Sequence, residues 1–182
     1  MYQIGDLILY GGTGVCRVLN ITAQNAAVDQ GEQLFYVLEP LYQSCTIFAP
    51  VHKTKVFMRP IISKDEAKRL IGTIPTLHVD AYHSRGTNEL TMHYKGALNT
   101  HDCSALLELT MSIYAKRRQL EQQKRKLGAV DERFMKRGED LLFGELSAAL
   151  GIPRDQVPEY IAKSVTEGQP AGHASAEVKD NT

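Results

Sequence analysis

The sequence predicts an α+β fold in which a small N-terminal β-barrel of the SH3 or Tudor type precedes a C-terminal all-α helical domain. Residues 1–60 consist of short segments rich in β-branched and aromatic residues, with turn residues between them. After Pro60 the apolar residues recur at helical spacing. The length of 182 residues is enough for two small domains.

Five strands are predicted in the N-terminal region, over residues 2–10, 15–23, 34–39, 46–49 and 56–59. Residues 11–14 read Gly-Gly-Thr-Gly, and glycines supply the positive φ of a hairpin turn at little steric cost. Residues 29–31, Asp-Gln-Gly, are a second predicted turn. Five short strands are too few for two packed sheets, so we expect one curled barrel over residues 1–62.

The helical domain is predicted to span residues 63–165. Ser63 followed by Glu66 is a capping box that opens a first helix ending near Gly72. A second helix over residues 88–98, capped by Thr87 or Asn88, carries one apolar stripe. The members of that stripe are Leu90, Tyr94, Ala97 and Leu98.

Three more helices and a tail complete the prediction. A long helix is expected over residues 102–127, and Asp131 is expected to cap the next helix, which stops at Gly151. A short helix follows over residues 157–165. Residues 166–182 are small, polar and aperiodic, which predicts a disordered tail.

Compartment and redox state follow from what the composition lacks. The apolar runs are far shorter than the roughly 20 residues of a membrane span, and the N-terminus does not resemble a signal peptide. Three scattered cysteines do not form a disulfide framework or a zinc site with paired CxxC motifs. We therefore expect a cytosolic protein with reduced thiols and no membrane partner.

Charge is distributed unevenly along a chain whose net charge is zero. Residues 116–137 contain nine bases and three acids, a local net charge of +6. Such a block indicates an anionic partner, although basic residues also commonly cover the exposed faces of long helices. The nine bases are Lys116, Arg117, Arg118, Lys124, Arg125, Lys126, Arg133, Lys136 and Arg137.

No pattern of an enzyme, a metal site or a cofactor site stands out. The six histidines do not have metal-ligand spacings, and GxSxG and HExxH are both absent. Residues 11–14 resemble a phosphate-binding loop only superficially, because a strand and not a helix is predicted after them. We therefore expect a binding protein without catalytic residues, cofactor or small-molecule substrate.

Several motifs resemble the CarD/CdnL family of bacterial transcription regulators. They are the run over residues 2–15, Tyr36-Val37-Leu38, Ala49-Pro50-Val51, Tyr94-Lys95 and Gly144-Glu145-Leu146. The resemblance covers about residues 1–152, and the order and spacing of the motifs make it specific. The barrel of this family is shared with the polymerase-interacting module of transcription-repair coupling factors.

The resemblance implies that the barrel pairs a strand edge with the RNA polymerase β subunit. It places the polymerase-binding positions at Gln24, Thr46 and Phe48, with Gln24 and Phe48 standing where the family carries arginines. It also implies that the helical domain lies at the upstream edge of the promoter bubble and stabilises the open complex. By the same resemblance the protein is expected to be cytoplasmic and nucleoid-associated.

The family inserts a tryptophan into the minor groove just before the Tyr-Lys pair, and this sequence has no tryptophan. The matching position is Leu90, which is either an apolar wedge or a core residue of its helix. The expected DNA-binding residues are Leu90, His93, Lys95, Lys124, Arg125, Lys126, Arg133 and Arg137. The alternative function is a polymerase-bound adaptor whose basic helix meets an acidic protein and does not bind DNA.

Overall fold

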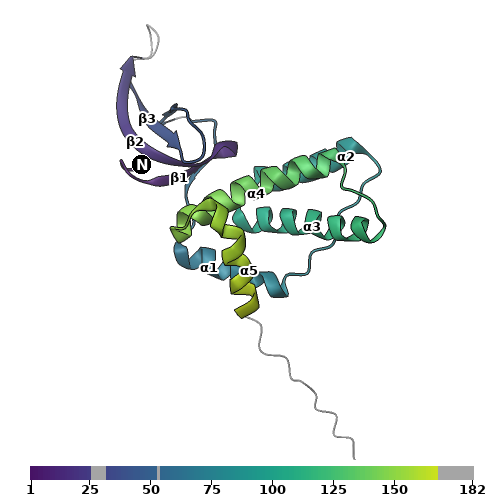
Figure 1. Cartoon of the computed structure of the whole chain (residues 1–182). Helices are drawn as coiled ribbons and strands as arrows, with labels where there is room; N and C mark the ends of the chain where they lie inside the picture. Colours follow the sequence, from purple (N-terminus) through teal and green to yellow (C-terminus); the bar gives the residue numbers. More distant parts are fainter. Residues whose placement is uncertain (26–31, 53, 168–182) are drawn as a thin grey trace, which may run out of the picture.

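An antiparallel β-sheet is followed by a helical region, which confirms the α+β class (Figure 1). The structure is a computed structural model that describes residues 1–25, 32–52 and 54–167. The predicted turn at residues 29–31 and tail residues 168–182 lie outside the described residues. The predicted tail residues 166 and 167 belong to the last helix instead.

The sheet contains the five predicted strands in the order β4-β3-β2-β1-β5. Their bounds are β1 Leu7–Tyr10, β2 Gly14–Asn25, β3 Glu32–Pro40, β4 Ile47–Pro50 and β5 Met58–Pro60. Every neighbouring pair is antiparallel. No backbone ladder joins β4 to β5 among the described residues, so the sheet keeps two edges and the predicted barrel is not closed.

The glycine-rich run folds β1 back onto β2, as predicted. Tyr10 pairs with Gly14 across a single 3-10 turn, and Gly11 and Gly14 have φ values of +44° and +95°. Further along β2 the register with β3 shifts between Val18 and Asn20, which marks a bulge at Leu19. Bulges increase the local twist of a strand, consistent with the strongly curved β2 in Figure 1.

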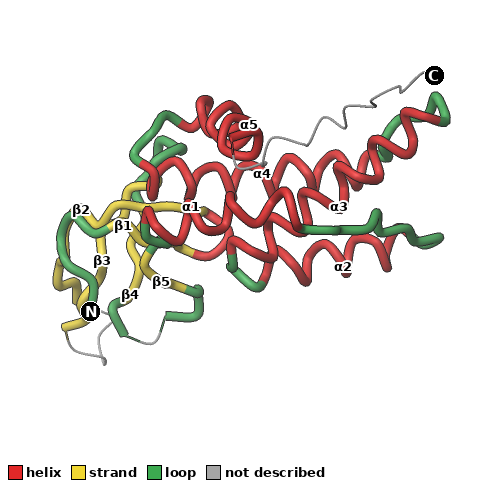
Figure 2. Tube along the Cα trace, turned by 90° about the horizontal axis from the view of Figure 1, so that it is seen from below, coloured by secondary structure: helices red, strands yellow, loops and turns green. Residues whose placement is uncertain are grey.

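The helical region contains the five predicted α-helices. Their bounds are α1 Lys64–Thr73, α2 Thr87–Asn99, α3 Cys103–Gln122, α4 Ala129–Leu150 and α5 Val157–Glu167. The Ser63–Glu66 capping box is present, and Gly151 ends α4 in the left-handed conformation with φ +70°. Figure 2 shows the sheet at one end of the molecule and the α3–α4 hairpin extending away from it.

Three further helix boundaries differ from the prediction. The helix predicted over residues 102–127 stops at Gln122, because the chain turns sharply at Lys124, whose φ is +56°. α4 begins at Ala129, so Asp131 lies inside its first turn and is not the cap. The N-cap of α2 is Gly86, without a side-chain hydrogen bond, instead of Thr87 or Asn88.

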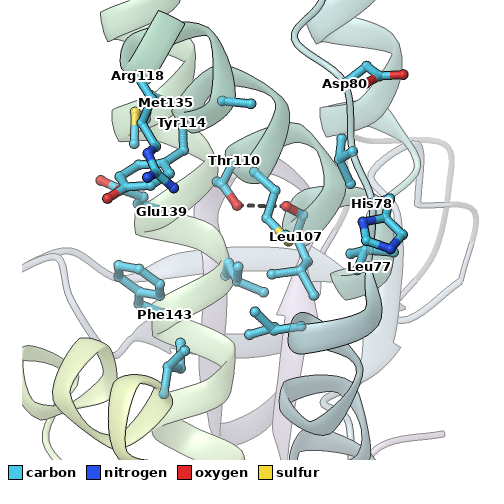
Figure 3. A pocket seen from close by; sticks show the side chains of 16 residues that line it. Leu77, His78, Asp80, Leu107, Thr110, Tyr114, Arg118, Met135, Glu139 and Phe143 are labelled. Carbon is cyan, nitrogen blue, oxygen red and sulfur yellow. Dashed lines mark hydrogen bonds between the residues drawn. The ribbon is translucent and has the colours of Figure 1, made fainter. Parts of the chain in front are cut away.

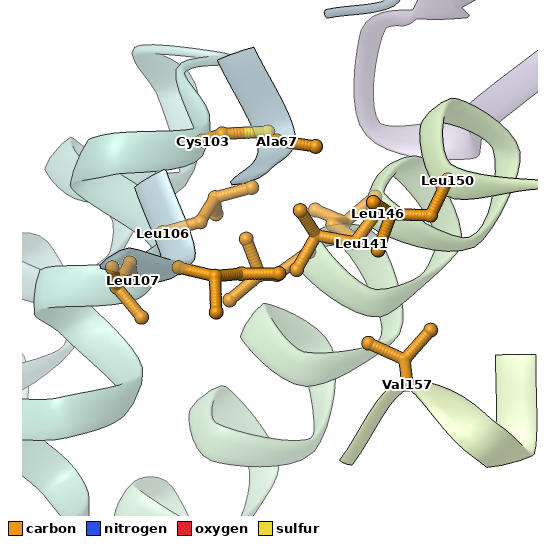
Figure 4. Close-up of a cluster of buried hydrophobic side chains, with 10 residues drawn as sticks. Ala67, Cys103, Leu106, Leu107, Leu141, Leu146, Leu150 and Val157 are labelled. Carbon is orange, nitrogen blue, oxygen red and sulfur yellow. The ribbon is translucent and has the colours of Figure 1, made fainter. Parts of the chain in front are cut away.

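Separate apolar clusters stabilise the two regions. In the sheet, Tyr36, Leu38 and Val18 are among the buried side chains of one cluster. In the helical region the apolar faces of α1, α3 and α4 meet α5, and Figure 4 shows Leu106, Leu146 and Val157 in this cluster. A third cluster joins α2 to the ends of α3 and α4 that lie far from the sheet.

Candidate functional site

Within the described residues, no strand pairs with the outer edge of β4. Val51 donates its amide hydrogen to the carbonyl of Leu34, and Ala49 lies opposite Tyr36. In an antiparallel pair the backbone groups of alternate residues face the partner, so those of Thr46, Phe48 and Pro50 face away from β3. Proline has no amide hydrogen, and the donors on this edge therefore belong to Thr46 and Phe48.

An apolar side chain accompanies this edge. Phe48 is 51% exposed, whereas its neighbour Ala49 is fully buried in the core of the sheet. Phe48 lies opposite Val37 of β3, which is half-buried, and Leu19 at the bulge of β2 is 42% exposed. The outer face of the sheet thus offers apolar surface beside unpaired backbone groups.

The three predicted polymerase-binding residues lie in this part of the sheet. Thr46 is exposed immediately before β4, and Phe48 lies within it. Gln24 is in β2, where its backbone pairs with Gln33 of β3. The structure describes no more than the backbone of Gln24, so its predicted contact stays a prediction.

The α3–α4 connection lies at the end of the helical region far from the sheet (Figures 1 and 2). We define the basic tip as the exposed bases of the α3–α4 connection and of the adjacent turns of α2 and α4. These residues are Lys95, Lys124, Arg125, Lys126, Arg133 and Lys136. Five of them come from the charge block, and the early end of α3 places Lys124, Arg125 and Lys126 on a loop instead of a helix face.

Two predicted DNA-binding residues are not free at the surface. Leu90 is 8% exposed and packs in the cluster that contains Tyr94 and Ile113. This is the core arrangement that helical spacing favours, and it removes Leu90 as an exposed wedge. Arg137 donates a hydrogen bond to the carbonyl of Gly12 in the β1–β2 turn, so it connects α4 to the sheet.

The exposed face of α2 is formed by other residues than Leu90. Met92 is 69% exposed and is the large apolar side chain that this helix presents to solvent. The exposed His93 stacks on Tyr82, with ring centroids 3.6 Å apart. This stack places the His93 ring against Tyr82 next to the exposed Met92.

A buried polar cluster behind the tip was not predicted. Asp131 of α4 is 3% exposed, and its Oδ1 accepts hydrogen bonds from Tyr94 Oη at 2.7 Å and from Lys116 Nζ at 2.8 Å. Lys116 therefore belongs to the interior and not to the basic surface. Burial, with the hydrogen bond and charge of Asp131, raises the pKa of Tyr94 well above its ordinary value. The cluster joins α2, α3 and α4.

A second buried cluster lies where the sheet meets the helices. Arg59 of β5 makes a bidentate ion pair with Glu145 of α4, which is fully buried. The same carboxylate accepts hydrogen bonds from Ile62 N at 2.9 Å and from Cys103 Sγ at 3.1 Å. A sequence signal for it was present, since Glu145 interrupts the buried stripe of α4 and a charge at such a position needs a partner.

An open apolar groove of about 590 Å³ runs along α3 and α4 (Figure 3). Figure 3 shows Leu77 and His78 on one side of it, and Glu139 and Phe143 of α4 on the other. Partial burial raises the pKa of Glu139 above its ordinary range. The groove contains an apolar floor and few polar groups, which suits packing more than reaction chemistry.

Reactive groups are few in the described part of the chain. Burial raises the pKa of Cys16 to about 11 and raises that of Cys103 further, so neither thiol ionises near neutral pH. In residues 1–25, 32–52 and 54–167 no three His, Cys, Asp or Glu side chains are grouped so that they could hold a metal ion. No helix within the same ranges is long and apolar enough to cross a membrane.

Comparison with known proteins identifies the sheet. Residues 2–62 match the family model of the CarD-like/TRCF RID domain. The match begins before β1 and ends at the connection to α1, so it contains all five strands and no helix of the helical region. No curated protein matches the chain at a significant level.

Proposed function

Because residues 2–62 belong to the CarD-like/TRCF RID domain family, which binds RNA polymerase, we propose that this protein is a bacterial transcription regulator acting in the cytoplasm at the nucleoid. It binds the β subunit of RNA polymerase through the sheet and contacts promoter DNA with the helical region. In doing so it stabilises the open complex at the upstream edge of the bubble. The single observation that carries the proposal is the family match of the sheet.

The β4 edge supports the polymerase half of the proposal. A strand of the β subunit would pair with the outward backbone groups of Thr46 and Phe48. The side chain of Phe48 would add apolar contact, since half of its surface is exposed in the free protein. A curl of the sheet towards a Tudor-like or SH3-like barrel belongs to the same proposal, supported by the bulged β2.

The basic tip supports the DNA half. Lys95, Arg133 and the bases of residues 124–126 are exposed at one end of the molecule, where phosphate groups could approach several of them together. With Leu90 buried, the apolar side chain that α2 offers to a minor groove is Met92. His93 lies beside it and completes that surface.

One observation favours the second candidate, a polymerase-bound adaptor without DNA contact. Of the bases in residues 116–137, Lys116 is buried against Asp131 and Arg137 is bonded to the β1–β2 turn, so the exposed charge is smaller than the sequence indicates. An acidic protein surface could meet this reduced tip. DNA-binding measurements decide between the two functions.

The polymerase half is tested with Phe48→Asp in the full chain. The variant should lose binding to isolated β subunit, because a charge on this surface would have to be desolvated in the complex. Tyr114→Asp is the matched control, since Tyr114 is 52% exposed and lies on α3. Undiminished binding by a folded Phe48→Asp protein would place the interface elsewhere.

The DNA half is tested by reversing Lys124, Arg125 and Lys126 to glutamate. Affinity for duplex DNA should fall for all sequences alike, and the slope of log affinity against log salt should flatten by about 0.9 for each phosphate that the variant no longer neutralises. The control reverses Lys64, Lys68 and Arg69, exposed bases of α1, which changes the net charge equally. Equal reductions of affinity in both variants would favour the adaptor.

A further inference from the structure

The connection between the sheet and the helical region has no flexible linker. β5 ends at Pro60 and α1 begins at Lys64. The amide hydrogens of the three residues between them are all used: Ile61 donates to Leu7 O, Ile62 to Glu145 Oε1 and Ser63 to Glu66 Oε2. A segment whose backbone donors are all bonded within the fold cannot swing as a tether.

The Arg59–Glu145 pair crosses this connection from strand to helix. Besides the bidentate pair, Arg59 donates from Nε and Nη2 to the carbonyl of His101, at 3.0 and 2.8 Å. The side chain thus joins β5 to α4 and to the residue pair preceding α3. Glu145 is fully buried in the joined molecule, so separation of the two regions would break this ion pair and leave the carboxylate without its cation.

A second set of contacts lies on the other side of α4. Tyr42, after β3, places its hydroxyl 3.1 Å from Gly144 O and 3.0 Å from Ser147 Oγ. The guanidinium of Arg154 lies 5.0 Å from the centre of the same ring. A Cβ at Gly144 would lie 3.1 Å from the Tyr42 ring, so the glycine permits this close approach.

We propose that these contacts lock the sheet and the helical region into one rigid body, with Glu145 as the positioning residue. The consequence for binding rests on the proposed function. The β4 edge and the basic tip lie at opposite ends of this body, so their separation and relative direction are fixed before polymerase or DNA binds. A bivalent protein that is pre-arranged in this way gains affinity for the combined target without new contacts.

The lock itself is tested without any partner. Spin labels are attached to the natural exposed Cys45 and to Gln122→Cys at the end of α3, since Cys16 and Cys103 are buried. Pulsed electron resonance should give one narrow distance distribution for the wild-type junction and a clearly broader one for Glu145→Gln. A broad wild-type distribution overturns the proposal, whether or not the variant folds. A narrow distribution in a folded Glu145→Gln protein shows that Glu145 does not position the two regions.

Tyr42→Phe is the second variant, because it removes a hydroxyl and leaves the ring under Arg154. It should broaden the distribution less than Glu145→Gln. Glu108→Gln is the matched control, an exposed residue of α3 that undergoes the same chemical change, and it should leave the distribution narrow. Broadening in the control equal to that of Glu145→Gln would overturn the assignment to the junction.

The coupling is then measured as three affinities of the full chain: for RNA polymerase alone, for duplex DNA alone and for polymerase bound at a promoter. Glu145→Gln should keep the affinities for polymerase alone and for DNA alone within about twofold of the wild type. It should reduce the affinity for polymerase bound at a promoter about tenfold, which is part of the affinity gain that linking two binding sites can supply. Equal changes in all three overturn the positioning role. Absence of both binary interactions in the wild type refutes the proposed function, whereas the distance distribution still decides the lock.

Discussion

Replacing Lys116 with methionine should strongly destabilise the protein. Methionine has a similar length and keeps the apolar contacts of the lysine stem, but it removes the cation that pairs with Asp131. The carboxylate is 3% exposed and would keep the hydroxyl of Tyr94 as its remaining side-chain partner. Leaving a buried charge without its partner costs about 3–5 kcal/mol. For a chain of this size that destabilisation lowers Tm by about 6–20 °C.

Urea unfolding followed by circular dichroism measures the destabilisation. Arg118→Met is the matched control, since Arg118 is exposed on the same helix and should change stability by less than about 0.5 kcal/mol. Adding Asp131→Asn to Lys116→Met should recover part of the stability, because the buried group is then uncharged. A destabilisation below about 1 kcal/mol in Lys116→Met, or a larger one in the double variant, would refute the assignment of Asp131 as a buried, charge-paired residue.

Three further predictions concern single residues. Leu90→Trp should cost about 1–3 kcal/mol by overpacking the core, whereas Met92→Trp on the exposed face should leave the unfolding free energy unchanged; equal effects would contradict the burial of Leu90. Glu139→Gln should raise the unfolding free energy near neutral pH, because a raised carboxyl pKa means that the ionised side chain disfavours the folded state. Glu139 contributes stability below the ordinary carboxyl pKa that is lost as pH rises through the raised value, so the advantage of the variant should vanish in acid; a pH-independent difference would argue against this cause. Of the three thiols, that of Cys45 should react rapidly with a thiol reagent at pH 8, and rapid reaction of Cys16 in the folded protein would contradict its raised pKa.

The strands and helices could be predicted because local patterns determine them. The glycines of residues 11–14 specified the β1–β2 hairpin, and Ser63 with Glu66 specified the start of α1. The same patterns failed where a tertiary contact decides the outcome. Aspartate is a residue type that often caps helices. The carboxylate of Asp131 instead accepts hydrogen bonds from Lys116 and Tyr94, which belong to two other helices.

The candidate surfaces, too, could be predicted where local patterns determine them and could not where tertiary contacts do. The exposure of Phe48 next to an apolar core strand follows the alternation of a β-strand, and residues 124–126 are exposed bases as the charge block indicated. Sequence spacing could not show that Lys116 faces inwards or that Arg137 reaches Gly12, because both depend on the angle between α4 and its neighbours. The stripe of α4 signals a buried charge at Glu145, but local patterns do not show that its partner is Arg59, 86 positions away.

Pro50 has a consequence for self-association. An exposed strand edge is a template on which further copies of a chain can stack into aggregates. On β4 the outward position after Phe48 is a proline, which supplies an acceptor but no donor, and the strand is four residues long. An added strand would find a regular ladder at Thr46 and Phe48, and the ladder would stop at the proline. The proline and the short strand therefore limit the ladder that a further copy of the chain could build on β4.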